Sequence, residues 1–184
     1  GDVTSASVQW PSGRLGNVGT HNIDALVMLL KRRVIGVSAT LDLSGRPDCR
    51  GPEFRDPGGW GILKMTGDVM VTVSAPDYGS FPARTEINGS KGRAVLSSQE
   101  VTIAYWDGRT EHWPAATDGI TGVDRAVSEM VEWLGQKAPF ACPPEEAVHT
   151  LETIVGFHAS HHKQGKWVAL PLQAEDRGFE VLSG

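Results

Sequence analysis

The part of the chain best suited to chemistry is a segment in which polar side chains recur at helical spacing. A helical wheel places four residues together, next to the apolar stripe of the same helix: Asn17, His21, Asp24 and Met28. An imidazole can act as a general acid or base near neutral pH. Asp24 could orient that ring, and Asn17 could hold a substrate hydroxyl group. The competing interpretation is that these polar side chains are partly buried between the helix and a sheet and have only a structural role.

The element that must position these side chains is a helix, predicted over residues 15–30. Apolar residues recur there at the three- and four-residue spacing of one buried face. A strand over 4–10 leads into the helix, and a longer strand over 34–43 follows it. Glycines surround the start of the helix, where they let backbone and ligands approach closely; they are Gly13, Gly16 and Gly19.

The remainder of the chain is predicted to be rich in strands and then helical. Residues 44–59 contain three prolines and four glycines, and the charged residues there, Asp56 among them, suit an exposed loop. Short β-rich runs follow over 60–66, 69–74, 83–88, 93–97, 101–106 and 110–113. Because their spacing leaves no room for crossover helices, we expect these strands to pair as an antiparallel meander.

Two helices and a last strand complete the predicted architecture. The helices cover 123–134 and 143–163, and the strand covers 167–170. The order of elements predicts an α+β fold of two layers, a large, mostly antiparallel open sheet with helices packed on one face. We expect residues 1–184 to form a single domain, since the length is that of one typical domain.

Composition excludes several classes of protein. The 17 basic and 22 acidic residues give a net charge of −5, which offers no electrostatic footprint for nucleic acid or an anionic membrane surface. The longest apolar run, over 25–30, is far shorter than the roughly 20 residues of a membrane span. We therefore expect a cytoplasmic protein. The chain starts Gly1-Asp2-Val3 and enters strand-like sequence at once, which indicates a piece of a longer protein.

Three segments together resemble one protein family. Leu15-Gly16-Asn17-Val18-Gly19-Thr20-His21-Asn22-Ile23-Asp24 resembles the signature helix in the C-terminal domain of the Gfo/Idh/MocA oxidoreductases. Glu86-Ile87-Asn88-Gly89-Ser90-Lys91-Gly92 resembles that family's run of an acid, an apolar residue and then Gly-x-x-Gly before a strand. The ending His158-Ala159-Ser160, then Gly165-Lys166-Trp167-Val168-Ala169-Leu170-Pro171-Leu172, resembles the family's usual ending. The resemblance covers nearly the whole chain.

The resemblance implies the substrate-binding and oligomerisation domain of an NAD- or NADP-dependent oxidoreductase that acts on a sugar, a polyol or a related carbonyl. It implies that His21 is the catalytic or substrate-binding histidine, and His21 is the candidate catalytic residue. Asn17 and Asp24 are the candidate substrate-binding residues, and for Asp24 a structural role is the preferred alternative. Asn17 stands where the family often has aspartate, and an amide cannot serve as a carboxylate base. A non-catalytic sugar-binding or assembly module of the same fold is the alternative.

The cofactor is expected to bind elsewhere than on this chain. A dinucleotide site needs G-x-G-x-x-G between a strand and a helix. The glycine-rich runs Gly58-Gly59-Trp60-Gly61 and Gly89-Ser90-Lys91-Gly92 lie among predicted strands and lack that helix. We therefore expect NAD or NADP to bind mainly to an N-terminal Rossmann domain that is absent from this chain.

A cluster of histidines near the end of the chain offers a second chemistry. His158 and His162 are four residues apart and could bind one metal ion from a helix, as in a metal-dependent hydrolase. Both also fall on the apolar stripe of Val148, Leu151 and Val155, predicted to lie close to the sheet, and no acid completes the set. Packing is the preferred interpretation, and no metal is expected. The two cysteines, Cys49 and Cys142, lack the pattern of a nucleophile.

Aromatic residues in the strand-rich region suggest a subunit interface. They are Trp60, Tyr105, Trp106 and Trp113. If one face of the sheet is left open by the helices, these side chains would suit a homodimer or tetramer formed through that face. Ordinary packing within the sheet explains them nearly as well.

Overall fold

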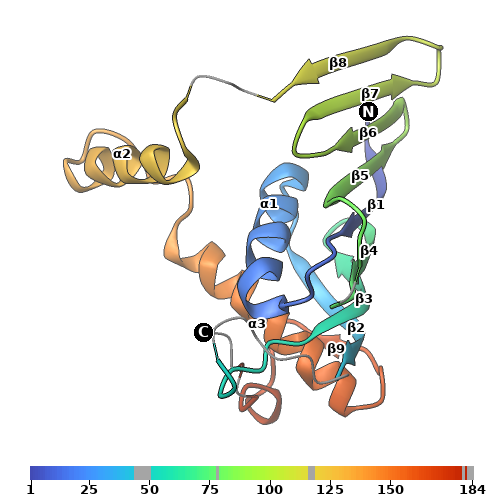
Figure 1. Cartoon of the computed structure of the whole chain (residues 1–184), viewed down its shortest axis with the longest axis vertical. Coiled ribbons are helices and arrows are strands. Elements are labelled where there is room, and N and C mark those ends of the chain that lie inside the picture. Colours follow the sequence, from blue (N-terminus) through green and yellow to red (C-terminus); the bar gives the residue numbers. More distant parts are fainter. Residues whose placement is uncertain (44–50, 78, 116–118, 180, 182–184) are drawn as a thin grey trace.

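The computed structural model describes residues 1–43, 51–77, 79–115, 119–179 and 181, and nine strands in it form one sheet (Figure 1). The strands are β1 (Val3–Gln9), β2 (Val34–Asp42), β3 (Gly58–Met65), β4 (Met70–Ala75), β5 (Arg84–Gly89), β6 (Gly92–Leu96), β7 (Glu100–Tyr105), β8 (Thr110–Pro114) and β9 (Val168–Ala169). The helices are α1 (Thr20–Leu30), α2 (Gly122–Leu134) and α3 (Pro144–His162), with a π-helical turn over Leu15–Gly19 and a 3₁₀ turn over Ala174–Asp176. The α+β fold with a mostly antiparallel sheet is confirmed.

The order of the strands differs from the predicted meander at one point. The order across the sheet is β8-β7-β6-β5-β1-β4-β3-β2-β9, so that β4 and β5 do not pair with each other. Strand β1 lies between them, parallel to β4 and antiparallel to β5. The prediction of one continuous meander is therefore wrong. It failed because spacing between successive strands carries no information about a strand inserted from the start of the chain.

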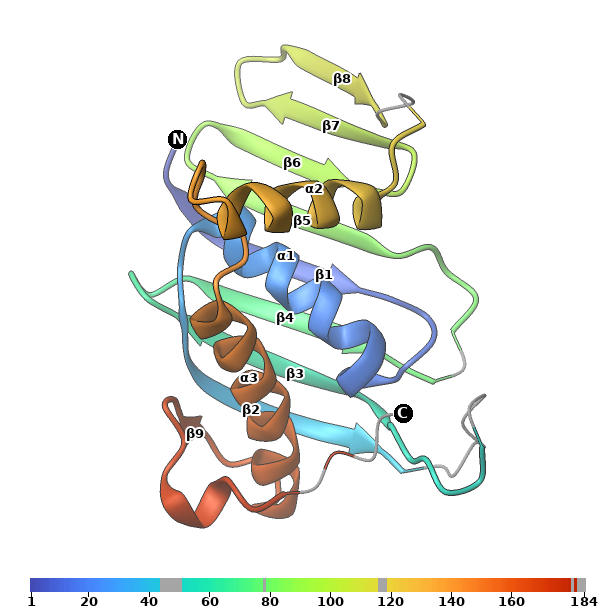
Figure 2. The ribbon, with the colours of Figure 1, turned by 90° about the vertical axis from the view of Figure 1, so that its left-hand side faces the viewer.

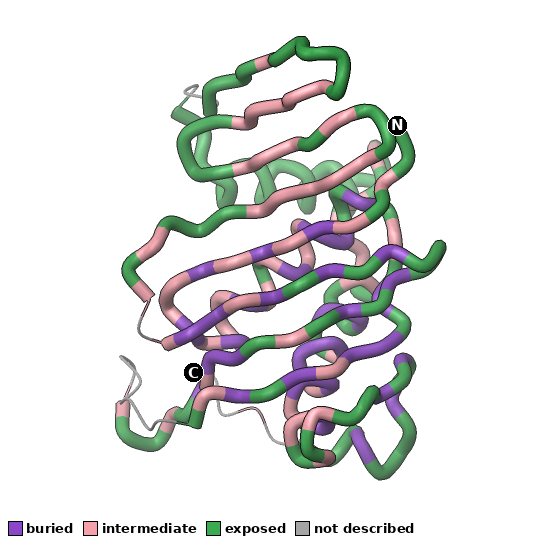
Figure 3. The backbone as a smooth tube through the Cα atoms, turned by 90° about the vertical axis from the view of Figure 1, so that its right-hand side faces the viewer, coloured by how far each residue is buried: buried purple, intermediate pink, exposed green. Residues whose placement is uncertain are grey.

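The strand register separates the two faces of the sheet. One row faces the helices and runs across Leu63, Val71, Ala6, Ile87, Ala94 and Ile103. The neighbouring row faces the opposite side and runs across Ile62, Thr72, Ser7, Glu86, Val95, Thr102 and His112. Figure 3 shows this second face, over which none of the described helices lies. The open sheet face predicted from the sequence is present.

Helices α1 and α3 cover the β1–β4 half of the other face (Figure 2). The core between the layers includes Trp10, Ile23, Leu26, Ile154 and Phe157, all nearly inaccessible to solvent. Burying side chains of this size stabilises the fold by about 1.5–3 kcal/mol each. The core therefore fixes the orientation of α1, which carries the candidate site.

The side of α3 that faces the sheet is not the one that the sequence predicts. Val148 and Leu151 are exposed, and the buried side instead carries His149, Thr153 and Ser160. The prediction that the apolar stripe with Val148 and Leu151 lies close to the sheet is wrong, because it assigned the buried side from hydrophobicity alone. His149 and Ser160 bond to the backbone of β2, as described below, and Thr153 Oγ1 donates to the His149 carbonyl of its own helix.

Helix α2 covers 122–134, against the predicted 123–134, and stands apart from the layer that α1 and α3 form (Figure 1). Every one of its residues is exposed. A capping box begins the helix: the Asp124 backbone N–H donates to Thr121 Oγ1 at 3.1 Å, and the Thr121 backbone N–H donates to Asp124 Oδ2 at 3.0 Å.

Candidate functional site

The start of the first helix is held by a buried carboxylate. Asp56, only 6% exposed, accepts hydrogen bonds from the backbone N–H groups of Gly16 and Asn17, both at 2.7 Å. These are N–H groups without a partner inside the helix, and a negative charge there also complements the helix dipole. The expectation that Asp56 lies exposed in its loop is wrong, because the carboxylate has a structural partner 39 residues earlier in the chain.

The glycine turn before the helix is closely packed, as its composition suggests. Trp10 Nε1 donates to the Gly13 carbonyl at 2.6 Å, and Gly13 has a φ of 56°, a region that favours glycine. A Cβ on Gly19 would lie 3.2 Å from the Trp10 ring. The indole and the carboxylate of Asp56 together fix where α1 begins.

His21 lies in the first turn of α1 with its side chain exposed. Its imidazole has no hydrogen bond to any of the residues that the structure describes. Asn17, half-buried in the π-helical turn, accepts a hydrogen bond on its carbonyl from Thr20 Oγ1 at 2.8 Å. The backbone of Asn17 is thus fixed on both sides, while His21 faces solvent and is free to meet a ligand.

Asp24 joins α1 to α3. Its Oδ1 accepts a hydrogen bond from Thr150 Oγ1 at 3.4 Å, and the carboxylate is half-buried. Among the described residues no hydrogen bond links Asp24 to His21. The carboxylate that could orient the imidazole therefore bonds to α3 in this structure.

A cavity of about 340 Å³ lies beside the C-terminal half of α1. Its lining includes Asp24 and Met28 but neither Asn17 nor His21, and Cys142 and Glu146 close its other side. Burial, with the negative charges of Asp24 and Glu146, raises the pKa of the Cys142 thiol, so the thiol is a poor nucleophile. The four residues of the predicted polar face are thus separated. Asn17 and His21 lie at the start of the helix outside the cavity, and Asp24 and Met28 line it. Cys49 lies outside the described residues.

Polar side chains of α3 bind the backbone of β2, a role that the sequence did not reveal. His149 Nε2 accepts a hydrogen bond from the Val34 N–H at 3.0 Å, and His161 Nδ1 accepts one from the Leu41 N–H at 3.2 Å. Ser160 Oγ accepts a third from the Ala39 N–H at 2.8 Å. Strand β9 pairs with only two residues of β2, so α3 supplies acceptors that a longer edge strand would otherwise provide.

The other histidines of α3 have separate environments. His158 is half-buried, its Nε2 has no hydrogen-bond partner in the described part of the chain, and burial followed by the charge of His161 lowers its pKa. His162 is exposed, and its ring lies 5.5 Å from the ring of Phe179. Within the described ranges, no group of three or more His, Cys, Asp or Glu side chains is arranged to hold a metal ion.

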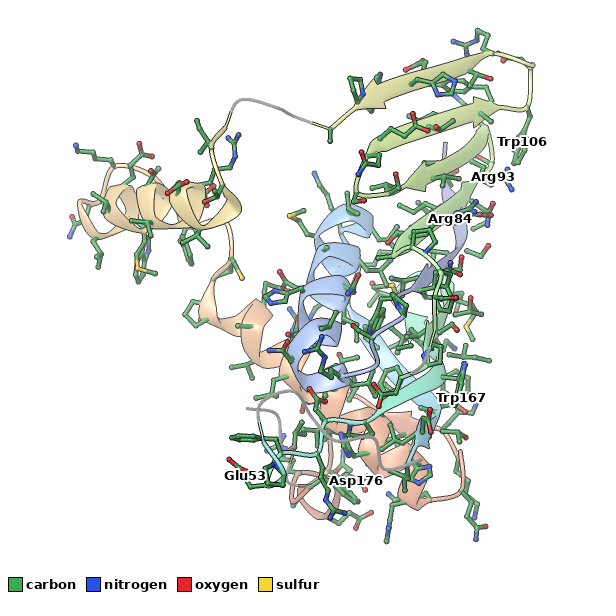
Figure 4. The ribbon with its side chains drawn as sticks, in the orientation of Figure 1. Glu53, Arg84, Arg93, Trp106, Trp167 and Asp176 are labelled. Carbon is green, nitrogen blue, oxygen red and sulfur yellow. The ribbon has the colours of Figure 1, made fainter. Side chains whose placement is uncertain are left out.

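The aromatic residues singled out as a possible interface do not share one face. Trp60 lies in register beside Ser74, in the same alternation as Ile62, and therefore on the open face. Trp113 follows His112 on β8 and points to the opposite side. Figure 4 shows Trp167 together with Arg84 and Arg93 on the side of the sheet away from the helices. The open face thus combines an apolar part near Trp60 with a charged part on β5 and β6.

The glycine-rich runs lie where a dinucleotide could not use them. Gly58–Gly61 belongs to β3, and Gly89–Gly92 forms the turn between β5 and β6. Neither leads into a helix, so neither presents backbone N–H groups and a helix dipole to a pyrophosphate. None of the helices in the described part of the chain has the length and apolar character needed to cross a membrane.

Solved structures with the same fold are oxidoreductases of the Gfo/Idh/MocA type. An oxidoreductase domain protein from Kribbella flavida aligns with a TM-score of 0.74 at 15% identity, over 93% of this chain and 60% of its own. The aldose-aldose oxidoreductase from Caulobacter crescentus, complexed with glycerol, aligns at 0.73 and 15% identity, over 92% of this chain and 56% of its own. The WlbA dehydrogenase from Bordetella pertussis, in complex with NADH and UDP-GlcNAcA, aligns at 0.66 and 16% identity, over 94% and 56%.

These alignments confirm the fold that the family resemblance implies. The chain spans a little over half the length of each of these structures. No protein-family model and no curated protein sequence matches the chain. The chain therefore shares its α+β fold with part of each of these oxidoreductases.

Proposed function

We propose that the chain is the substrate-binding and oligomerisation domain of an NAD- or NADP-dependent oxidoreductase acting on a sugar, a polyol or a related carbonyl. One observation of this chain supports the proposal above others. His21 is exposed and makes no hydrogen bond to the residues that the structure describes, at the start of a helix that a buried carboxylate holds in place. The names of the aligned structures, with glycerol, NADH and UDP-GlcNAcA as ligands, support the same chemical class.

In this proposal His21 exchanges a proton with the reacting oxygen of the substrate. The imidazole can donate that proton when a carbonyl is reduced and accept it when an alcohol is oxidised. Asn17 holds a neighbouring hydroxyl group through its amide, and Asp24 contacts the substrate from the next turn. The nicotinamide, bound by a separate N-terminal Rossmann domain, supplies or accepts the hydride.

The proposal extends to assembly and location. The open sheet face, with Trp60 and Ile62 exposed on it, suits contact with a second copy of the chain. We propose a homodimer or homotetramer in the cytoplasm, with neither nucleic acid nor membrane as a partner.

The experiment is a comparison of two histidine variants in the product of the entire reading frame. We expect His21→Ala to lower kcat by 10²- to 10⁴-fold, the usual contribution of a general acid or base. His112→Ala, which removes an exposed histidine of β8, should leave turnover within about twofold. Equal turnover of His21→Ala and wild type would remove the catalytic role.

The alternative, a non-catalytic sugar-binding or assembly module, makes a different prediction for the same protein. Asn17 in the place of an acid supports it, because an amide cannot relay a proton. That module would bind a sugar-like ligand in calorimetry, and His21→Ala would weaken the binding. It would show no change in nicotinamide absorbance with any sugar, polyol or carbonyl substrate.

A further inference from the structure

The cavity beside the C-terminal half of α1 has the size of a small-molecule site. Its volume of about 340 Å³ lies at the lower end of the range of such sites. It is bounded by α1, by the three residues that follow α1, and by the segment that leads into α3. Since neither Asn17 nor His21 lines it, the cavity is separate from the turn that carries the candidate catalytic histidine.

Two of the cations that line the cavity have partners of their own. Arg32 Nη1 donates a hydrogen bond to the Thr66 carbonyl at 2.9 Å. Arg33 Nη1 donates to Glu146 Oε1 at 2.7 Å, so these two charges of opposite sign form an ion pair at the wall. Neither arginine therefore needs a ligand to satisfy it.

Lys31 is the third cation of the wall, and its charge is not matched. The ammonium group makes no hydrogen bond or ion pair with the part of the chain that the structure describes. The remaining carboxylate of the lining, Asp24, already accepts a hydrogen bond from Thr150. It also lies seven residues before Lys31, which is about 10 Å along the axis of a helix. The lining thus has an excess of one positive charge at its Lys31 end, where an anion would form a charge-assisted hydrogen bond.

The wall between these two ends is apolar. Val27 and Met28 form it on α1, and Ala141 and Cys142 form it on the opposite side. The raised pKa of Cys142 keeps the thiol uncharged at neutral pH, and a methionine side chain adapts its shape to a ligand. A hydrocarbon body fits such a wall. A polyhydroxylated sugar does not, because its hydroxyl groups would lose water without regaining hydrogen bonds.

We propose that this cavity binds a small organic carboxylate with an apolar body. The carboxylate group bonds to the ammonium group of Lys31, and the hydrocarbon body lies against Val27, Met28 and Cys142. This ligand differs in chemistry from the sugar-like substrate of the function proposed above, and the inference does not rest on that function.

Binding is tested in the product of the entire reading frame with butanoate, hexanoate and octanoate as probes. The protein reacts with N-ethylmaleimide at rising probe concentration, and peptide mass spectrometry measures labelling of Cys142 separately from that of Cys49. We expect at least one carboxylate to slow the labelling of Cys142 at least tenfold at saturation. Hexan-1-ol has the same hydrocarbon body as hexanoate without the charge, and it should slow the labelling less than twofold at the same concentrations.

Two lysine variants test the assignment of the anion to Lys31. Lys31→Gln removes the charge and keeps a long polar side chain, so it should raise the carboxylate concentration for half-maximal protection of Cys142 at least tenfold. Lys91→Gln removes an exposed lysine from the turn between β5 and β6 and should leave that concentration within about twofold. A lysine here also complements the dipole at the C-terminus of α1, so ligand binding and not stability is the readout.

A third variant tests the cavity itself without changing its charge. Ala141→Phe places a large side chain in the wall and should abolish protection of Cys142 by every probe.

Four results would overturn the proposal. They are no slowing by any of the three carboxylates, equal slowing by hexan-1-ol, equal half-maximal concentrations for Lys31→Gln and wild type, and undiminished protection in Ala141→Phe. A Cys142 thiol that reacts in urea but not in the folded product would show that another part of the protein fills the cavity, and this would also overturn it. None of these measurements depends on turnover, so failure of the proposed function and failure of this site are distinguishable.

Discussion

Asp56 shows how one buried carboxylate can set the position of a candidate catalytic residue that it does not touch. It accepts the N–H groups of Gly16 and Asn17, and the helix that follows presents His21 one turn later. Charge-assisted hydrogen bonds of this kind contribute about 1.5–3 kcal/mol each. The orientation of His21 therefore depends on the segment just before β3.

We expect Asp56→Asn to destabilise the protein by about 2 kcal/mol. An asparagine amide keeps one oxygen acceptor but turns an NH₂ donor toward the second backbone N–H, which is also a donor. The free energy of unfolding in urea measures the effect. Glu53→Gln is the matched control, because Glu53 is exposed on the same segment (Figure 4). A loss of less than about 0.5 kcal/mol for Asp56→Asn would contradict the role of Asp56.

The sequence was informative about the residues of the site and less informative about their contacts. Helical spacing correctly placed His21 and Asp24 on α1, and Asn17 lies in the π-helical turn that leads into it, because spacing is a local property. It could not show that Asp24 bonds to Thr150 or that Asp56 caps the helix, because these contacts join distant parts of the chain. In the sequence, an aspartate before a Pro-Gly pair cannot be distinguished from an ordinary loop residue. Only the fold shows that the start of the helix lies beside it.

At the scale of elements, the contact between α3 and β2 depends on two neutral imidazoles. His149 and His161 both accept a backbone N–H through a ring nitrogen, which requires that nitrogen to carry no proton. Burial, and then the positive charge of Arg33, lowers the pKa of His149 below its ordinary value of 6.5. The folded state thus favours the neutral ring more strongly than the unfolded state does.

We expect the protein to lose stability as the pH falls below about 6.5, the pKa of an unfolded histidine. In that range the unfolded chain takes up protons that the folded chain does not, so acid favours unfolding. The loss amounts to about 1.4 kcal/mol for each unit by which the folded pKa is lowered, and it ends below that folded pKa. Urea midpoints measured between pH 8 and pH 5 test the direction.

The variant His149→Gln tests whether His149 causes part of that pH dependence of stability. Glutamine offers an oxygen to the Val34 N–H and does not titrate, so the variant should lose less stability between pH 8 and pH 5 than wild type. His112→Gln, on the exposed edge of β8, serves as the control and should follow the wild-type profile. Identical profiles for all three proteins would contradict the assignment to His149.

The type of each long element was predictable, and its partners were not. Periodicity identified α1, α2, α3 and most strands, since each pattern extends over several residues. It misplaced the buried side of α3, where His149 and Ser160 bond to β2 and exclude the apolar Val148 from the sheet. It also could not tell that the apolar stripe of α2 finds no cover among the described residues.

At the scale of the whole molecule, α1 and α3 cover one face of the sheet over β1–β4 and the other face is open, and assembly should depend on the open face. Trp60→Asp should therefore reduce association, because it places a charge in the apolar part of the open face. Trp113→Asp makes the same change on the opposite face and should leave the mass in solution unchanged. Sedimentation equilibrium at micromolar concentration measures both. A monomeric wild-type protein, or equal masses for the two variants, would contradict assembly through the open face.

The position of β1 has a consequence for the order in which the molecule can fold. Strands β5 to β8 are joined by short turns and form from local contacts, as does the β3–β4 hairpin. Neither group can join the other until β1, the earliest strand in the sequence, pairs with both at once. Such pairings between distant residues form slowly, because closing a long loop costs entropy before any contact repays it. The two halves of the sheet thus join only when they capture the first strand, and until then each half has an unpaired edge open to wrong partners.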